Sequence, residues 1–366
     1  LVRTYRQKPE VTIEPPGGGA MAPVLRDGVL TARIRTGAQQ QIARVKAFAG
    51  GVVAPPGKVV ARELVGDDVV ATYRWELAAP ADEQLLLQVV AATDEGVAAS
   101  DQLVVANEVP RPPRQPTLYF FAAAVDQYRD AQIPKLSTPV RDARTLTDLL
   151  RTQAARLYRV AATALTGDQV TRPGWQFMTA HHAEEMRQRA IPDDLLVIFL
   201  SGHGGQDPES DQFHFVTADA AYREIASGSY ADCLSFAELA QFGDISCRKL
   251  VILDTCHGGA IQPLRHRELK RAVRTLQDDL LITLAASQGD QEAVEGRFAR
   301  ELIAALRGRA DVEAGNGDGV ITLDELIADV ERAVRAASVG DPVEQCPSAG
   351  PRELLPYLHV PLTTVR

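Results

Sequence analysis

The stretch LVILDTCHGG, Leu250–Gly259, decides how the rest of the chain is interpreted. An apolar run leads directly into an acid, a thiol and two glycines. An earlier stretch, LLVIFLSGHGG at Leu195–Gly205, has the same form and leads into a histidine between glycines. Either each stretch is a core strand followed by an ordinary glycine turn, or the two together present a reactive cysteine beside a histidine.

From Leu118 onward, continuous apolar runs alternate with segments in which apolar residues recur at helical spacing. Strands are predicted at 118–125, 158–165, 194–201, 249–254 and 279–287. Helices are predicted at 139–158, 177–190, 235–242 and 296–309. Such alternation indicates an α/β fold, a mostly parallel sheet with helices on both faces. Active residues of such sheets lie at the carboxyl ends of the strands, which is where both motifs fall.

The region before residue 109 has a different pattern and is predicted to be all-β. Short β-rich runs separated by Gly, Pro and Asp lie at 11–13, 28–36, 42–51, 58–65, 69–79, 84–96 and 100–107. Residues 1–108 therefore resemble an immunoglobulin or fibronectin type III β-sandwich, which we interpret as a scaffold or a partner-binding module. Four prolines stiffen the linker at 109–117, so that 118–366 forms the second domain.

Composition narrows the class of function. A net charge of −9 argues against a nucleic-acid partner, and no apolar run reaches the length of a membrane span. The first residues also lack the apolar core of a signal peptide. The four cysteines show no CxxC spacing, so neither a zinc site nor a disulfide framework is indicated, and a reducing, cytoplasmic setting is expected.

Cys256 and His203 are the candidate catalytic pair. A free thiol is mostly protonated near pH 7, and a neighbouring imidazole takes its proton so that the thiolate can attack an acyl carbon. Backbone N–H groups of Gly204 and Cys256 are candidates for the oxyanion hole, because glycine leaves the approach open. A lone cysteine after a strand is more often an inert core residue, but here the histidine precedes it by 53 positions, close to the caspase spacing.

Both motifs, in this order and with their flanks, resemble the caspase–metacaspase clan of cysteine peptidases. Its bacterial members carry a strand ending in S/A-G-H-G and a later strand ending in D-x-C-x-[SG]-G, and the similarity extends over most of 117–308. The resemblance implies Cys256 as nucleophile, His203 as general base and acid, and an oxyanion hole from Cys256 and Gly204. Gly258 stands where Ser is common, and His257 is a minor alternative partner for the thiol.

The same resemblance implies a specificity pocket for a basic side chain. Asp142, Asp254 and Ser201 match the residues that line it in metacaspases, and two carboxylates would hold Arg or Lys. The position of the aspartate-binding Arg of animal caspases is Leu136 here. Cleavage after Arg or Lys is therefore expected, with Arg141 as an alternative partner for Asp142. No cofactor is required for this chemistry.

Two further segments carry expectations of their own. The basic segment 262–279 is either a self-cleaved activation linker or a solvated amphipathic helix. NGDGVITLDEL at 316–326 resembles the second part of an EF-hand loop. Calcium is a candidate cofactor there, and the loop near 311–325 is equally interpreted as a degenerate turn. The candidate metal ligands are Asp311, Asn316, Asp318 and Glu325.

Two other functions stay open alongside the peptidase. One is a catalytically silent interaction protein that keeps the fold. Loss of His203 or Cys256 would favour it, and both residues are present. A cysteine-dependent esterase or acyltransferase would use the same pair but gives no reason for paired acids. The expected partner is a protein or peptide substrate with Arg or Lys before the cut, together with a protein bound through the β-sandwich.

Overall fold

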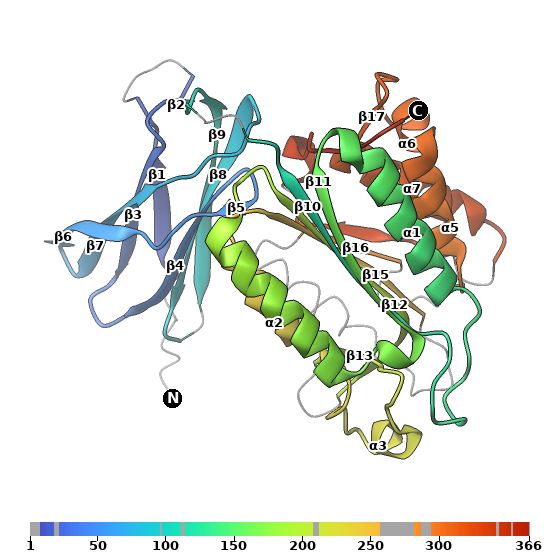
Figure 1. The fold of residues 1–366 in the computed structure, drawn as a ribbon. Helices are drawn as coiled ribbons and strands as arrows, with labels where there is room; N and C mark the ends of the chain where they lie inside the picture. The colour runs from blue at the N-terminus through green and yellow to red at the C-terminus, as the bar shows by residue number, and fades with distance from the viewer. Residues whose placement is uncertain are drawn as a thin grey trace. The chain divides into compact units, whose positions relative to one another are not determined.

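The computed structural model of the protein divides into two compact units, residues 1–114 with 191–193, and residues 115–190 with 194–366 (Figure 1). It describes residues 8–17, 22–95, 97–110, 114–207, 212–256, 282–286, 294–341, 344–352 and 354–365. The predicted strands of the N-terminal region and the alternating strands and helices after it are both present.

The first unit is a sandwich of two sheets. One sheet has the order β1-β3-β7-β6 and the other β2-β9-β8-β4-β5. Their strands are β1 (Glu10–Glu14), β2 (Val24–Leu25), β3 (Val29–Gly37), β4 (Ile42–Ala49), β5 (Val52–Val53), β6 (Lys58–Val65), β7 (Asp68–Glu76), β8 (Gln84–Thr93) and β9 (Ala98–Asn107). Alternate residues of β3 and β8, with Trp75 of β7, form one core between the sheets. The order matches the A-B-E-D and G-F-C arrangement of immunoglobulin-like sandwiches.

The second unit is built on a largely parallel sheet. Its strand order is β11-β10-β12-β15-β16-β18, where the first five are parallel and β18 is antiparallel. These strands are β10 (Thr117–Ala124), β11 (Arg159–Thr166), β12 (Leu195–Gln206), β15 (Arg248–Cys256), β16 (Ile282–Ala285) and β18 (Ser348–Gly350). Two short strands, β13 (Phe213–Phe215) and β14 (Leu234–Ser235), continue from the end of β12, and β17 (Val320–Thr322) pairs separately with β19 (Pro361–Thr364).

Helices cover both faces of this sheet. Figure 1 shows α2 on one face and α1, α5 and α7 on the other. The described helices are α1 (Pro139–Gln153), α2 (Arg172–Arg189), α3 (Tyr222–Ala226), α5 (Arg297–Ala304), α6 (Ala310–Glu313) and α7 (Leu323–Ala337). The central strands are buried along their whole apolar length, as β10 illustrates. Parallel strands with both faces covered need this continuous apolar sequence.

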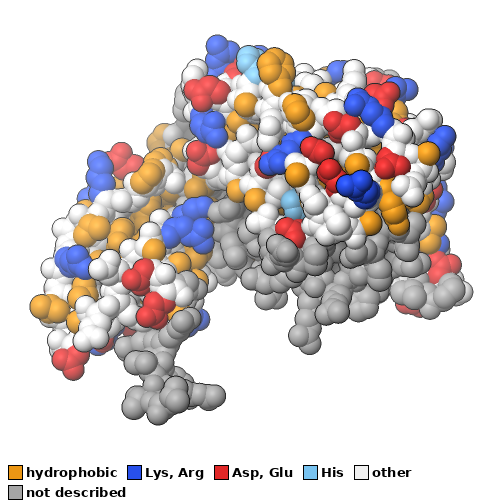
Figure 2. All heavy atoms as spheres, turned by 90° about the horizontal axis from the view of Figure 1, so that it is seen from below, with side chains coloured by type: hydrophobic (Ala, Val, Ile, Leu, Met, Phe, Trp, Pro, Cys, Tyr) orange, Lys and Arg blue, Asp and Glu red, His pale blue; other side chains and the backbone are white. Residues whose placement is uncertain are grey.

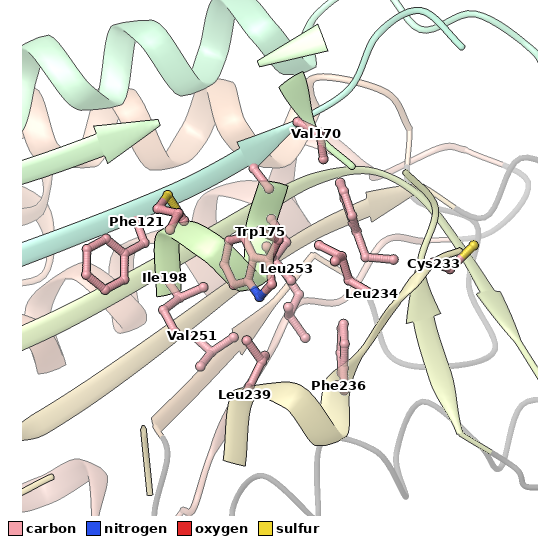
Figure 3. Packing of buried hydrophobic residues seen from close by; sticks show 14 of the residues in the cluster. Phe121, Val170, Trp175, Ile198, Cys233, Leu234, Phe236, Leu239, Val251 and Leu253 are labelled. Carbon is pink, nitrogen blue, oxygen red and sulfur yellow. The ribbon is translucent and has the colours of Figure 1, made fainter. Parts of the chain in front are cut away.

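The core beneath α2 fixes one face of the central strands. Trp175 of α2 lies among Phe121, Ile198, Val251 and Leu253, which come from β10, β12 and β15 (Figure 3). Side chains alternate along a strand, so the residues between these belong to the opposite face. In β12 and β15 that opposite face is the one on which α1 packs, and it includes Ser201 and Asp254.

On the face drawn in Figure 2, acidic and basic side chains of the described residues are interspersed among apolar ones. Among the described helices, none combines the length and the apolar character needed to cross a membrane.

Candidate active site

Both sequence motifs end on neighbouring strands of the sheet. β12 and β15 are parallel and paired from Leu195–Arg248 onward, and this register brings Ser201 beside Asp254. Two residues further on, His203 and Cys256 are register partners. Of Cys256 the structure describes the backbone. The register thus places the candidate base and the candidate nucleophile side by side at the carboxyl edge of the sheet, where α/β proteins hold their active residues.

His203 is held by residues that precede helix α1. The imidazole is buried, stacks on Tyr128 with ring centroids 5.2 Å apart, and its Nε2 lies 2.8 Å from the carbonyl oxygen of Pro134. The His203 backbone N–H donates to the Tyr128 hydroxyl at 2.9 Å. A carbonyl oxygen only accepts, so Nε2 carries the proton and the neutral ring keeps the lone pair on Nδ1. This tautomer is the one a general base needs.

The glycines around His203 have a packing role that sequence reasoning did not supply. Gly202 adopts φ +156°, and a Cβ there would lie 3.0 Å from the Phe215 ring. A Cβ on Gly204 would lie only 2.2 Å from the Phe213 ring. The Phe213 ring therefore excludes a side chain at Gly204, and the Phe215 ring leaves little room for one at Gly202, where the positive φ also favours glycine. This packing explains the glycines independently of the oxyanion hole expected at Gly204.

Asp254 forms the buried centre of an acidic group. Its Oδ2 accepts a hydrogen bond from Ser201 Oγ at 3.0 Å, and the side chain is 3% exposed. Burial raises the pKa of Asp254 to about 7, against the lowering effect of Ser201, while the nearby Asp142 and Glu295 raise it further. The carboxyl is therefore poised between its neutral and charged forms at neutral pH.

Asp142 reaches this group from the first turn of α1. Its carboxylate is buried, and Arg141 Nε contacts Oδ1 at 3.1 Å. Its Oδ2 is buried and has no hydrogen-bond partner. Arg141 is 70% exposed, so this ion pair only partly satisfies the carboxylate. Asp142 thus has an unused acceptor close to Asp254.

Glu295 is a member of this group that the sequence did not point to. Its Oε1 accepts the backbone N–H and the hydroxyl of Ser137 and, at 3.1 Å, the N–H of Thr138. It lies 153 residues after Asp142 along the chain and immediately before α5. No local motif signals such a long-range contact, and the same holds for Tyr128 and Pro134.

The other described cysteines do not compete as nucleophiles. Burial raises the pKa of Cys233 to about 12 and that of Cys247 to about 11. Both stay protonated thiols at neutral pH and are unreactive. Cys346 is of intermediate exposure.

Several sequence predictions fall outside the described residues. His257 and Gly258 belong to the segment 257–281, as does the basic stretch 262–279.

The predicted metal ligands lie around the turn from α6 into α7. Asp311 is buried in α6, whereas Asn316 and Asp318 lie on the exposed loop and Glu325 on α7. The Asp318 N–H donates to Asn316 Oδ1 at 3.0 Å, and Glu325 Oε2 accepts the N–H of Thr322 at 2.9 Å as part of a capping box. In the part of the chain that the structure describes, no three His, Cys, Asp or Glu side chains converge into a ready-made metal cluster.

Comparisons with known proteins were made on the whole chain. A family model for the caspase domain matches residues 123–355. The structure of pro-sf-caspase-1 is 12% identical with a TM-score of 0.41, over 65% of this chain and 92% of that chain. Caspase-1 from Spodoptera frugiperda is 11% identical with a TM-score of 0.38, over 66% of this chain and 88% of that chain. No curated protein sequence matches the chain significantly.

Proposed function

Since the chain belongs to the caspase-domain family, whose model matches residues 123–355, we propose that it is a cysteine endopeptidase that cuts proteins after Arg or Lys. The observation that carries the proposal is the register of β12 and β15, in which His203 and Cys256 are partners. In the proposed reaction His203 accepts the thiol proton of Cys256, the thiolate attacks the scissile carbonyl carbon, and His203 returns the proton to the leaving amine. Water then hydrolyses the thioester.

The acidic group supports the preference for a basic residue before the cut. Asp254 and Asp142 place two carboxyl groups in a buried site, and Asp142 Oδ2 has no partner. A guanidinium donates two parallel hydrogen bonds to a carboxylate, which suits such acceptors. The charge of the substrate would also favour the ionised form of Asp254, whose pKa in the protein is raised to about 7. Ser201 orients Asp254 through its 3.0 Å hydrogen bond.

The decisive experiment combines turnover with active-site labelling. Wild type and Cys256→Ala are compared on matched peptides with Arg, Lys, Asp or norleucine before the scissile bond. We expect wild type to prefer Arg or Lys, and the variant to lose about 10³-fold or more in kcat/KM. A thiol-reactive peptide carrying Arg should label wild type and Cys346→Ser equally, because the proposed nucleophile is Cys256.

Two results would overturn the proposal. Labelling of Cys346 instead of Cys256 would indicate non-specific alkylation and a catalytically silent interaction protein. Faster cleavage after Asp than after Arg would leave the peptidase intact but reverse its specificity.

Self-processing within 262–279 is part of the same proposal. The segment contains Arg265, Arg267, Lys270, Arg271 and Arg274, each a basic residue of the kind the acidic group would accept. Mass spectrometry should find fragments ending at these residues in wild type and none in Cys256→Ala. Fragments that form equally in both proteins would point to another protease.

We propose a cytoplasmic location, because Cys233 and Cys247 are buried thiols outside any disulfide. The β-sandwich is proposed to bind a protein partner.

A further inference from the structure

The turn between α6 and α7 carries features that peptide hydrolysis does not use. We propose that this turn is a calcium site in which the carboxylates of Asp311 and Glu325 are the charged ligands. The proposal does not depend on the peptidase activity. It concerns residues 311–325, whose sequence resembles only the second half of an EF-hand loop.

Asp311 is a buried carboxylate at this turn, and one of its two oxygens has no partner. The residue is 4% exposed, and its Oδ2 accepts the backbone N–H of Gly319 at 3.2 Å. Its Oδ1 is buried and has no hydrogen-bond partner. A buried carboxylate oxygen without a partner raises the free energy of the folded state, and a bound cation would remove this penalty. The bond to Gly319 fixes the carboxylate against the loop backbone.

Glu325 meets Asp311 beside Gly315. An ideal Cβ on Gly315 would lie 2.4 Å from Glu325 Oε1 and 2.8 Å from the Asp311 carbonyl oxygen. Only glycine fits where these two oxygens approach the same backbone atom. Glu325 Oε2 accepts the Thr322 N–H at 2.9 Å, which holds the side chain while Oε1 faces Gly315. A side-chain oxygen of Glu325 and the backbone carbonyl oxygen of Asp311 thus lie on the same side of Gly315.

The turn between them follows EF-hand spacing in its second half. An EF-hand loop needs glycine at its sixth position and a glutamate six residues later. Gly319, with φ +84°, and Glu325 satisfy this rule. The first position of a regular loop would fall on Ala314, which cannot ligate. We assign this role to Asp311, three residues earlier on α6.

The set of donors favours calcium over other metals. Carboxylate, amide and carbonyl oxygens suit hard cations such as calcium. Asn316 and Asp318 lie on the exposed loop and hydrogen-bond to each other, and in the proposed site their side chains rotate toward the ion. With two charged ligands, of which Asp311 is buried and Glu325 is half-buried, we expect a dissociation constant of about 10⁻⁴–10⁻³ M, the range of weak calcium modules.

Isothermal titration and thermal unfolding of the full chain test the site. Calcium chloride at about ten times the dissociation constant should raise the midpoint of the α/β unit by roughly 3–6 °C, and magnesium should not. Asp311→Asn and Glu325→Gln should each abolish the shift and the titration heat. Glutamine also serves at the third position of a capping box, so Glu325→Gln keeps the start of α7. Glu313→Gln is the matched control, because Glu313 lies on α6 two residues from Asp311 and its side chain is 54% exposed.

The proposal is overturned if wild type shows no calcium heat up to about 10 mM, a concentration that would fill even a site at the weak end of this range. It is also overturned if Asp311→Asn and Glu325→Gln bind calcium as wild type does, or if magnesium gives an equal shift. Should Asp311→Asn fail to fold by circular dichroism, Glu325→Gln alone decides.

Discussion

At the scale of single residues, the acidic group is tuned by burial. Asp254 has a pKa raised to about 7, first because of its burial and then because Asp142 and Glu295 repel its charge. Ser201 donates to it and opposes the rise. Ionising such a buried carboxyl is unfavourable, and a cation bound beside it offsets the unfavourable free energy. The affinity for a basic substrate side chain is therefore expected to depend on the protonation state of Asp254.

Substitution of Asp254 by asparagine should remove both the preference for Arg and its pH dependence. Below pH 7 Asp254 is mostly neutral, so kcat/KM on Arg peptides should rise as pH increases through about 7 in wild type. Asp254→Asn should lower kcat/KM about 10²–10³-fold and flatten this rise. The measurement is a kcat/KM profile spanning about two pH units on each side of 7. Asp148→Asn, on the exposed face of α1, is the control, and an unchanged profile in Asp254→Asn would refute the assignment.

The same variant should be more stable than wild type above pH 7. The folded-state pKa of Asp254, about 7, exceeds the ordinary value of 3.8, so the folded state loses stability as pH rises between these values. Each unit of such a shift corresponds to about 1.4 kcal/mol. Denaturant unfolding at pH 8 should show Asp254→Asn gaining up to a few kcal/mol, with the difference vanishing near pH 4. A loss of stability at pH 8 would mean that the charged Asp254 has a partner that compensates its burial.

Sequence reasoning found the residues that belong to a motif and missed those that support them. His203 and Asp254 were found because each ends an apolar strand beside glycines or a thiol. Tyr128 and Pro134 lie in the loop before α1, and Pro134 contributes a backbone carbonyl that any residue could supply. Such contacts depend on the folded path of the loop, so no residue type at a fixed spacing reveals them.

At the scale of elements, the start of α1 depends on a residue from another part of the chain. Thr138 is the N-cap of α1 but makes no side-chain cap hydrogen bond. Glu295, immediately before α5, supplies the acceptor for the N–H groups of Ser137 and Thr138 instead. Because Asp142 lies one turn into α1, this contact connects the segment before α5 to the acidic group.

Removing Glu295 should loosen this connection. Glu295→Ala should destabilise the α/β unit by about 1 kcal/mol, the usual value of a lost cap, since Glu295 is exposed. It should also raise KM for Arg peptides more than it lowers kcat, because it acts on the placement of Asp142 and not on the reacting atoms. Glu295→Gln keeps an acceptor and should recover most of both effects. An equal loss with Gln and Ala would show that charge, and not capping, is what matters.

The type of a helix could be predicted where the periodic segment is long. It was harder to predict where the helix is short or interrupted. The predicted helix at 139–158 is observed as α1, which ends earlier, at Gln153, and is followed by a 3₁₀ turn at Ala154–Arg156. The predicted helix at 235–242 is a 3₁₀ helix, Phe236–Phe242. In the predicted helix at 296–309, the regular α-helix stops at Ala304. A π-helical turn follows it, and Gly308 in this turn has φ +125°. Apolar spacing shows which face is buried but does not fix the hydrogen-bond pattern of a short turn.

At the scale of the whole molecule, each unit has its own hydrophobic core and its own tryptophan. Trp75 is 2% exposed in the core of the β-sandwich, and Trp175 is 1% exposed in the α/β core (Figure 3). The chain contains only these two tryptophans. The composition change near residue 110 predicts that there are two units, but the pairing of non-consecutive strands in both depends on contacts that no local pattern specifies.

This division makes each unit separately observable. In Trp75→Phe the fluorescence reports the α/β unit, and in Trp175→Phe it reports the sandwich. We expect two unfolding transitions, because units with separate cores unfold as separate cooperative elements. A covalently attached peptide carrying Arg on Cys256 binds only the folded α/β unit, so it should raise the midpoint seen by Trp175 and leave that seen by Trp75 unchanged. Cys256→Ala in each background is the control for the peptide. If both midpoints rise together, the two units unfold as one, and the sandwich must then be treated as part of the peptidase.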